Sequence, residues 1–256
     1  KEKFNWSTVF TFSHNKNKIV HLFNTDLDGD GREDDNIANS WFIGQPINSY
    51  FDYVFDGIYQ EGDDDIPPGS EPGFVRVKDL NQDGVINAAD RTVIGSGNIP
   101  EYQYGLRNNL SYGNFSLSVF LNAMQGWMAP FNLINPLVPG RSLNQLDAGW
   151  WTPENQSTTR PSLVYSNPLR TNWYLSRDFV RIRDLTLSYD FSQPALDKLK
   201  LNGLNVYLTG KNLGILTDWL GTDPENGGAY TSEQGSDALY PMPRTFLIGV
   251  NMSFQT

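Results

Sequence analysis

Long runs of alternating apolar and polar residues constrain the fold of this chain more than any other feature. One run places apolar side chains at every second position, at Phe115, Leu117, Val119, Leu121 and Ala123. Further runs of this kind lie at residues 4–12, 102–112, 185–191, 204–208 and 246–254. Successive side chains of a β-strand point to opposite faces, so a period of two predicts strands with one apolar face. We therefore expect an all-β protein with a single short helical turn.

The links between these runs alternate between short and long. The short links are residues 113–114 and 192–202, and the long ones cover 60–101, 127–177 and 213–243. Outer-membrane β-barrels have short turns at one end and long extracellular loops at the other, and their strands have about 9–11 residues. The pattern predicts about seven to nine antiparallel strands of a transmembrane barrel that is larger than residues 1–256. A soluble β-sandwich is the alternative, with shorter strands and more even loops.

The composition excludes several classes of protein. The 256 residues include no Cys, and no apolar stretch approaches the roughly 20 residues of a transmembrane helix. The net charge of −10 is local, because residues 26–35 carry −5, residues 61–90 carry −6 and the remainder carries +1. Nucleic-acid binding needs a basic stripe, so we expect no nucleic-acid partner. Two acidic clusters in a nearly neutral chain indicate cation sites instead.

Residues 79–90 have the pattern of a calcium-binding loop of the EF-hand or dockerin kind. Calcium takes about six to eight oxygen ligands, which such loops supply from positions 1, 3, 5, 7, 9 and 12. The candidate ligands, in that order, are Asp79, Asn81, Asp83, the Val85 carbonyl, Asn87 and Asp90. Gly84 stands at the sixth position, where the loop turns sharply. We expect a structural Ca²⁺ ion that fixes a long loop, and a solvated acidic turn is the alternative.

Residues 26–37 begin in the same way. The candidate ligands at positions 1, 3, 5 and 7 are Asp26, Asp28, Asp30 and the Arg32 carbonyl. Position 12 is Ile37, which has no side-chain oxygen. The final carboxylate therefore has to come from Asp34, from Asp35 or from elsewhere. We expect a second Ca²⁺ site here, in a compact surface loop.

Five tryptophans lie in or beside the long links: Trp127, Trp150, Trp151, Trp173 and Trp219. They either stack on the sugar rings of a glycan or pack one loop against another, and we favour packing. No enzyme motif accompanies them, because the chain has neither a G-x-S-x-G elbow nor a convincing pair of catalytic carboxylates. We therefore expect no enzymatic activity, and a glycoside hydrolase fragment is the least favoured alternative.

A series of short motifs runs through the chain in order. They include 44–47, 56–60, 72–73, 77–87, 151–155, 179–189, 210–213, 221–225 and 243–245. Each motif is weak alone. Their succession covers almost the whole chain and resembles the late, C-terminal part of the barrel in the SusC/RagA family, the TonB-dependent outer-membrane transporters of Bacteroidota.

The resemblance implies a place in the cell outer membrane, within a barrel completed by strands and a plug outside this segment. It implies a SusD-like surface lipoprotein as a lid, an oligosaccharide or peptide as ligand, and TonB as the energy source, acting through the plug. The resemblance identifies no substrate-binding residue. The alternative function is a secreted, calcium-stabilised β-sandwich that binds glycans.

The resemblance also sets strand directions, because the last strand of such a barrel runs toward the periplasm. The outward strands are then 203–212, 115–126 and 50–59, and the inward strands are 178–191 and 102–112. Residues 14–49 form either two more strands, near 17–25 and 37–45, or an irregular periplasmic excursion.

Overall fold

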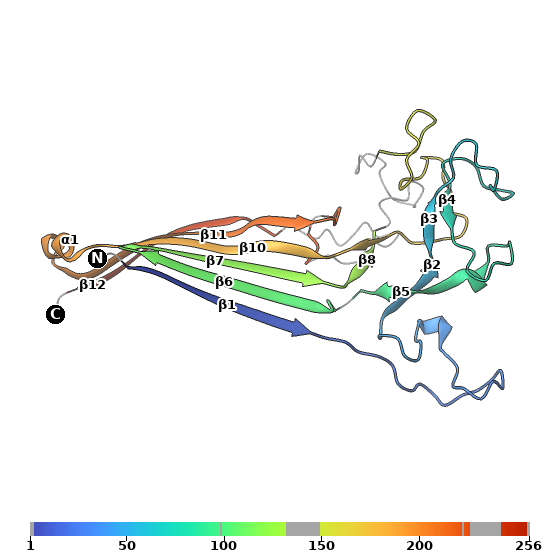
Figure 1. Cartoon of the computed structure of the whole chain (residues 1–256), viewed down its shortest axis with the longest axis horizontal. Coiled ribbons are helices and arrows are strands. Elements are labelled where there is room, and N and C mark those ends of the chain that lie inside the picture. Colours follow the sequence, from blue (N-terminus) through green and yellow to red (C-terminus); the bar gives the residue numbers. More distant parts are fainter. Residues whose placement is uncertain (1–2, 98, 132–148, 222, 226–241, 255–256) are drawn as a thin grey trace.

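The computed structural model describes residues 3–97, 99–131, 149–221, 223–225 and 242–254 (Figure 1). Its largest part is a blade of six antiparallel strands in the spatial order β1-β6-β7-β10-β11-β12. The strands are β1 (Phe4–His14), β6 (Tyr102–Tyr112), β7 (Phe115–Gln125), β10 (Phe179–Asp190), β11 (Leu201–Thr217) and β12 (Thr245–Phe254). Each has at least 10 residues, which is long enough for a tilted strand to cross a bilayer.

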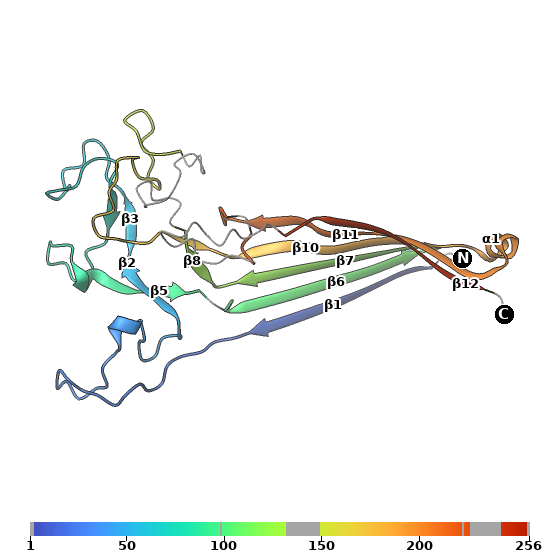
Figure 2. The same ribbon diagram turned by 180° about the vertical axis from the view of Figure 1, so that it is seen from behind.

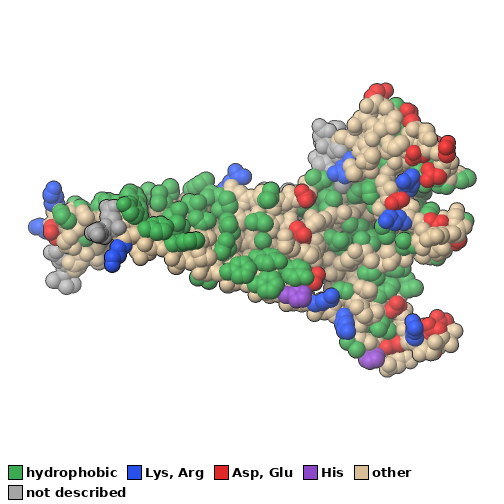
Figure 3. All heavy atoms as spheres, in the orientation of Figure 1, with side chains coloured by type: hydrophobic (Ala, Val, Ile, Leu, Met, Phe, Trp, Pro, Cys, Tyr) green, Lys and Arg blue, Asp and Glu red, His purple; other side chains and the backbone are tan. Residues whose placement is uncertain are grey.

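The register of the blade separates an apolar face from a polar one. Strand pairing aligns one row across all six strands: Trp6, Leu110, Leu117, Leu187, Leu208 and Ile248. The next row, on the opposite face, is Ser7, Asn109, Ser118, Thr186, Thr209 and Leu247. The apolar side chains are exposed, with 66% of Trp6 and 77% of Ile248 accessible, and Figure 3 shows hydrophobic groups spread along the blade. Such a face suits contact with lipid.

The described parts of all three long links lie at one end of the blade and the short links lie at the other (Figures 1 and 2). The short links are the turn at 113–114 and the segment with α1 (Gln193–Leu199). The predicted alternation of short and long links is therefore confirmed. Among the described residues, no helix is both long enough and apolar enough to span a membrane.

The described residues of the long links, together with residues 15–59, form a head that contains most of the buried core. Its strand pairs are β2 (Ser49–Tyr53) with β5 (Arg91–Ser96), β3 (Phe55–Ile58) with β4 (Val75–Val77), and β8 (Met128–Pro130) with β9 (Tyr174–Ser176). Two 3-10 turns, η1 (Ile37–Asn39) and η2 (Ala88–Asp90), lie beside them. The core cluster consists of Ile58, Val75, Val77, Ala129, Phe131, Trp151, Tyr165, Trp173 and Trp219. In the described part of the chain, the blade is one sheet without a second layer.

The predicted outward strand over 50–59 is wrong. β1 pairs with β6 over its whole length, so residues 15–101 form a single excursion between neighbouring strands of the blade. The apolar residues of this segment serve the head instead, where Ile58 is 4% and Tyr59 6% exposed. Gly57, at φ 112°, interrupts the extended run.

The two expectations for residues 14–49 are also wrong. These residues are all described, and between β1 and β2 they contain only isolated bridges, such as Ile19 with Ile43, and the turn η1. They lie at the head end of the blade, with the long links, and not at the end of the short turns (Figure 1). Residues 25–36 do form a compact loop, as expected for a calcium site.

Candidate cation loops and the head

The two acidic loops share one hydrogen-bond pattern. In each, the carboxylate at position 1 accepts the backbone N–H groups of the fourth and sixth residues. The distances are 2.8 and 3.1 Å at Asp26, and 2.7 and 2.8 Å at Asp79. The backbone conformation repeats as well, because the fourth and sixth residues of both loops have positive φ. One local geometry is therefore built twice, from similar sequences.

The side chains at positions 3 and 5 also turn back onto the loop backbone. Each accepts the N–H two residues further on, at 3.1 Å for Asp28, 2.8 Å for Asp30, 3.0 Å for Asn81 and 2.8 Å for Asp83. Asx turns of this kind bring the side-chain oxygens to the concave side of the loop. The donors to Asp30 and Asp83 are the N–H groups of the position-7 residues, Arg32 and Val85.

The structure shows which carboxylate closes the first loop. In the second loop Asp90 is fully buried and accepts the N–H of Leu80, the second residue, at 2.9 Å. In the first loop Asp34 accepts the N–H of the corresponding residue, Leu27, at 2.8 Å. Asp34 at position 9 thus takes the structural place that Asp90 has at position 12. Asp35 accepts the N–H of residue 43 instead.

The carboxylates of the first loop are close enough for one ion. Ligand oxygens of Asp26, Asp28 and Asp34 all lie within 4.8 Å of one another. Calcium–oxygen distances are about 2.3–2.6 Å, so one ion can touch all three carboxylates. The donor set is oxygen only, which suits a hard cation.

In the second loop, two of the predicted ligands contact each other. Asn87 directs its amide nitrogen at the Val85 carbonyl, 3.1 Å away, so these two predicted ligands bond to each other. The N–H of Asn87 donates to Asp90 at 2.8 Å. This bond is the main reason that the pKa of Asp90 is lowered, and the N–H groups of Leu80 and Asn81 act in the same direction.

Glu33 is a residue of this region that the sequence pattern did not single out. Its carboxylate accepts the N–H groups of Leu22 and Asn24, both at 2.7 Å, and contacts His21 at 3.1 Å. The bond from Asn24 is the largest cause of the lowered pKa of Glu33. In the sequence, the only feature that could have pointed to Glu33 was its position among the acids of this loop.

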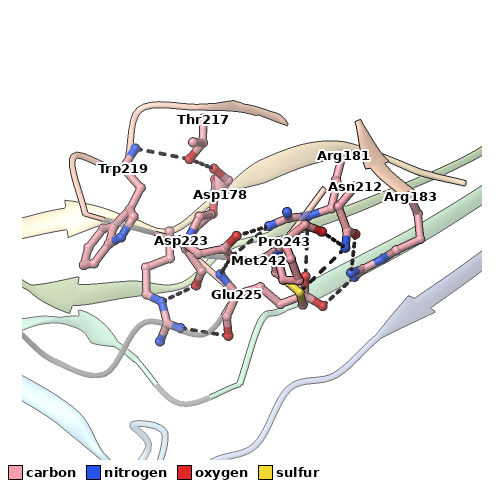
Figure 4. A network of polar contacts seen from close by, with 12 residues as sticks. Asp178, Arg181, Arg183, Asn212, Thr217, Trp219, Asp223, Glu225, Met242 and Pro243 are labelled. Carbon is pink, nitrogen blue, oxygen red and sulfur yellow. Dashed lines mark hydrogen bonds and ion pairs between the residues drawn. The ribbon is translucent and has the colours of Figure 1, made fainter. Parts of the chain in front are cut away.

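An ion-pair network joins two of the motifs at the head end of β10 (Figure 4). Arg181, 3% exposed, lies 2.8 Å from both carboxylate oxygens of Asp223, which is 5% exposed. Arg183 contacts Glu225 at 2.5 Å. The motif 179–189 therefore holds the motif 221–225 against the polar face of the blade. Thr222 of the second motif lies outside the described residues.

The tryptophans of the long links pack one loop against another. Trp127, Trp151, Trp173 and Trp219 are each 5–8% exposed. The Trp151 indole N–H donates to Gln60 at 3.0 Å. Gly73 lies against this ring, because a Cβ at residue 73 would stand 2.5 Å from the Trp151 ring. The favoured interpretation of packing is confirmed for these four tryptophans.

Three curated proteins of Formosa agariphila match 99% of the chain. TonB-dependent receptor P3 is 31% identical over 275 residues, receptor P26 is 28% identical over 285, and receptor P39 is 27% identical over 308. The predicted family resemblance is confirmed. The chain spans only 27–29% of the length of these TonB-dependent receptors. No family model matches it.

Solved structures show the same fold. The RagAB peptide importer in its open-open state superimposes with a TM-score of 0.68 at 23% identity, covering 98% of this chain and 27% of that chain. The closed-closed state gives a TM-score of 0.67. The predicted fold class, antiparallel strands of a large barrel with long loops, is confirmed.

Proposed function

We propose that this chain forms part of the wall of an outer-membrane transporter that imports oligosaccharides or peptides. The observation that carries the proposal is the blade, with one exposed apolar face and the described parts of the long links at one end. Along 99% of its length, this chain matches a TonB-dependent receptor. A SusD-like lipoprotein is the partner at the head end. TonB acts through a plug that is outside this segment.

The comparisons favour peptides over oligosaccharides as cargo. The similar structures are described as a peptide importer and a peptide transporter. An enzymatic role has no support, because the relatives are receptors and transporters.

Cell fractionation tests the location and the partner. An antibody against residues 60–101 should detect the protein in the outer membrane, at a mass well above the 28.9 kDa of this segment, and a lipoprotein should co-purify. A soluble 28.9 kDa product would contradict the proposal and support the secreted β-sandwich.

Uptake separates the two classes of cargo. Cells with and without the gene would be compared for accumulation of labelled peptides and labelled oligosaccharides. Gene-dependent uptake should stop when a protonophore removes the proton-motive force. Uptake that continues would contradict TonB coupling.

The two acidic loops bind Ca²⁺ in this proposal and stabilise the head. The first ion is held by Asp26, Asp28, Asp30, Asp34 and the Arg32 carbonyl. The second is held by Asp79, Asn81, Asp83, Asp90, the Val85 carbonyl and, after its amide turns, Asn87. The repeated loop geometry and the three clustered carboxylates support this assignment.

Calorimetric titration of the full-length protein with CaCl₂ tests the ions. Asp26→Asn and Asp79→Asn should each remove one binding event, and Asp218→Asn, at an exposed site outside both loops, should remove none. Extracellular calcium sites have Kd values of about 10⁻⁴–10⁻³ M, so unchanged titrations up to about 10 mM would contradict the assignment.

A further inference from the structure

A cavity of about 400 Å³ lies in the head between the β3–β4 pair and the β8–β9 pair. Its walls are mainly apolar and include Phe55, Val75, Val77, Trp173 and Leu175. Ligand pockets in proteins have volumes of about 300–1,000 Å³, so this cavity suits a group of the size of one amino-acid residue. It is too small for a chain of several sugars.

Arg160 is the one charged residue in the described lining of this cavity. Its guanidinium donates to the Thr159 carbonyl at 3.0 Å, and no carboxylate among the described residues forms an ion pair with it. Other arginines of the chain do have such partners, for example Arg76 with Asp56. Arg160 is half-buried, and this burial lowers the pKa of its guanidinium. A half-buried cation beside an apolar cavity favours an anionic ligand.

Several other polar groups of the lining already have partners within the protein. The Tyr174 hydroxyl and the Asn172 amide donate to Asp52 at 3.0 and 2.9 Å. The Thr171 hydroxyl donates to Asn167 at 3.1 Å. A sugar ring presents hydroxyl groups on all sides, and in this cavity most of them would lose water without gaining a partner. A ligand that is apolar except for one anionic group avoids this cost of desolvation.

We propose that this cavity binds an apolar group that carries a carboxylate, with Arg160 pairing the carboxylate and Trp173 covering the apolar body. The C-terminal residue of a peptide has this chemistry, and so does a small aryl-alkanoic acid. The inference rests on the proposed transport function, and it narrows the cargo from oligosaccharides or peptides to peptides with a free, apolar C-terminal residue, or to such acids.

The test compares ligands that differ only in the charged group. Full-length protein in lipid nanodiscs would be titrated with N-acetylphenylalanine and with N-acetylphenylalaninamide. We expect the acid to bind at least tenfold more tightly than the amide. Arg160→Gln should abolish this preference. Arg170→Gln, the same change at an exposed residue outside the cavity lining, should preserve it.

Two further arms complete the test. Ile94→Trp narrows the cavity and should weaken binding of acid and amide alike. A third ligand, 3-phenylpropionate, identifies the source, because weaker binding than N-acetylphenylalanine assigns the peptide end and tighter binding assigns a free acid. Equal affinity for acid and amide, an acid preference that survives in Arg160→Gln, or no binding of the acid would overturn the inference.

Failure of the cavity assignment can be distinguished from failure of the transport proposal. A protein that lies in the outer membrane and imports cargo, yet shows no acid preference, overturns only the cavity assignment. A protein absent from the outer membrane overturns the transport proposal, whatever the titrations show.

Discussion

Single residues decide how the two acidic loops differ. The loops share their first seven positions in geometry, yet the closing carboxylate comes from position 12 in one and position 9 in the other. Asp34 and Asp35 are neighbours with the same chemistry, but only Asp34 faces the acid cluster.

This difference predicts unequal effects of two matched substitutions. Asp34→Asn should remove one calcium-binding event, because it removes a charged ligand oxygen from the cluster. Asp35→Asn should leave the number of ions unchanged. Calorimetric titration measures both, and loss of an ion in Asp35→Asn alone would contradict the assignment.

Arg181 is the residue on which the network beside β10 depends. Both oxygens of Asp223 contact it and both side chains are almost fully buried, so Arg181→Ala leaves an unpaired buried carboxylate. Breaking a buried pair in this way costs about 3–5 kcal/mol. Amide hydrogen exchange should show lost protection at the Glu225 N–H, which donates to Asp223 at 2.9 Å.

Arg183→Ala is the matched control. Its pair with Glu225 is partly exposed, at 26% and 20% of the two side chains, so its loss should cost no more than about 1 kcal/mol. Equal loss of protection in the two variants would contradict the role given to burial.

At the scale of an element, the loop 79–90 should respond to acid. Backbone N–H groups hold Asp90 ionised and lower its pKa below the unfolded value of about 3.9. The resulting stability is present above that value and is lost as pH falls through the lower, folded pKa. With a chelator present, protection of the Leu80 N–H should be constant from about pH 7 to 5 and fall below about pH 4.

Asp90→Asn checks the cause of that response. The amide does not titrate, so the loss of protection in acid should disappear, although the loop is less stable at neutral pH. A wild-type loop that loosened between about pH 7 and 5 would point to a different titrating group.

The contact between the segment at 72–73 and the loop at 151–155 gives a second prediction for an element. Gly73→Ala places a methyl group against Trp151 at a residue with φ 87°, so it should displace the indole and destabilise the head. Gly69→Ala has a similar φ of 88° but open space around it. Gly69→Ala should cost about 1 kcal/mol and Gly73→Ala clearly more, as measured by the tryptophan fluorescence of thermal unfolding. Equal shifts would mean that the contact is unimportant.

For the whole molecule, the two faces of the blade should tolerate charge differently. Leu185 lies on the apolar face and Ser188 on the polar face of the same strand, β10. Lys at the lipid face costs about 2–4 kcal/mol near the membrane centre. Leu185→Lys should therefore reduce the folded, heat-modifiable form on gel electrophoresis, and Ser188→Lys should not. Similar losses in both variants would contradict the orientation of the sheet.

Local sequence patterns were sufficient to predict much of the fold. The six strands of the blade follow from alternation, because each residue's face depends only on its position in the strand. The strand expected over 50–59 came from the strand order that the family resemblance implies, and in the structure these residues form short strands of the head instead. Which partner a strand takes depends on residues far along the chain, such as the pairing of Trp6 with Leu110.

Neighbouring residues are enough to predict the six strands of the blade, the alternation of the links and the oxygen-bearing side chains of the two acidic loops. Three other features follow from folding in three dimensions: Asp34 closes the first loop, Arg181 meets Asp223 from 42 residues away, and Arg160 borders an apolar cavity. These features depend on contacts between segments that are far apart in the sequence and on packing of the head. A repeating pattern of neighbouring residues carries no information about such contacts.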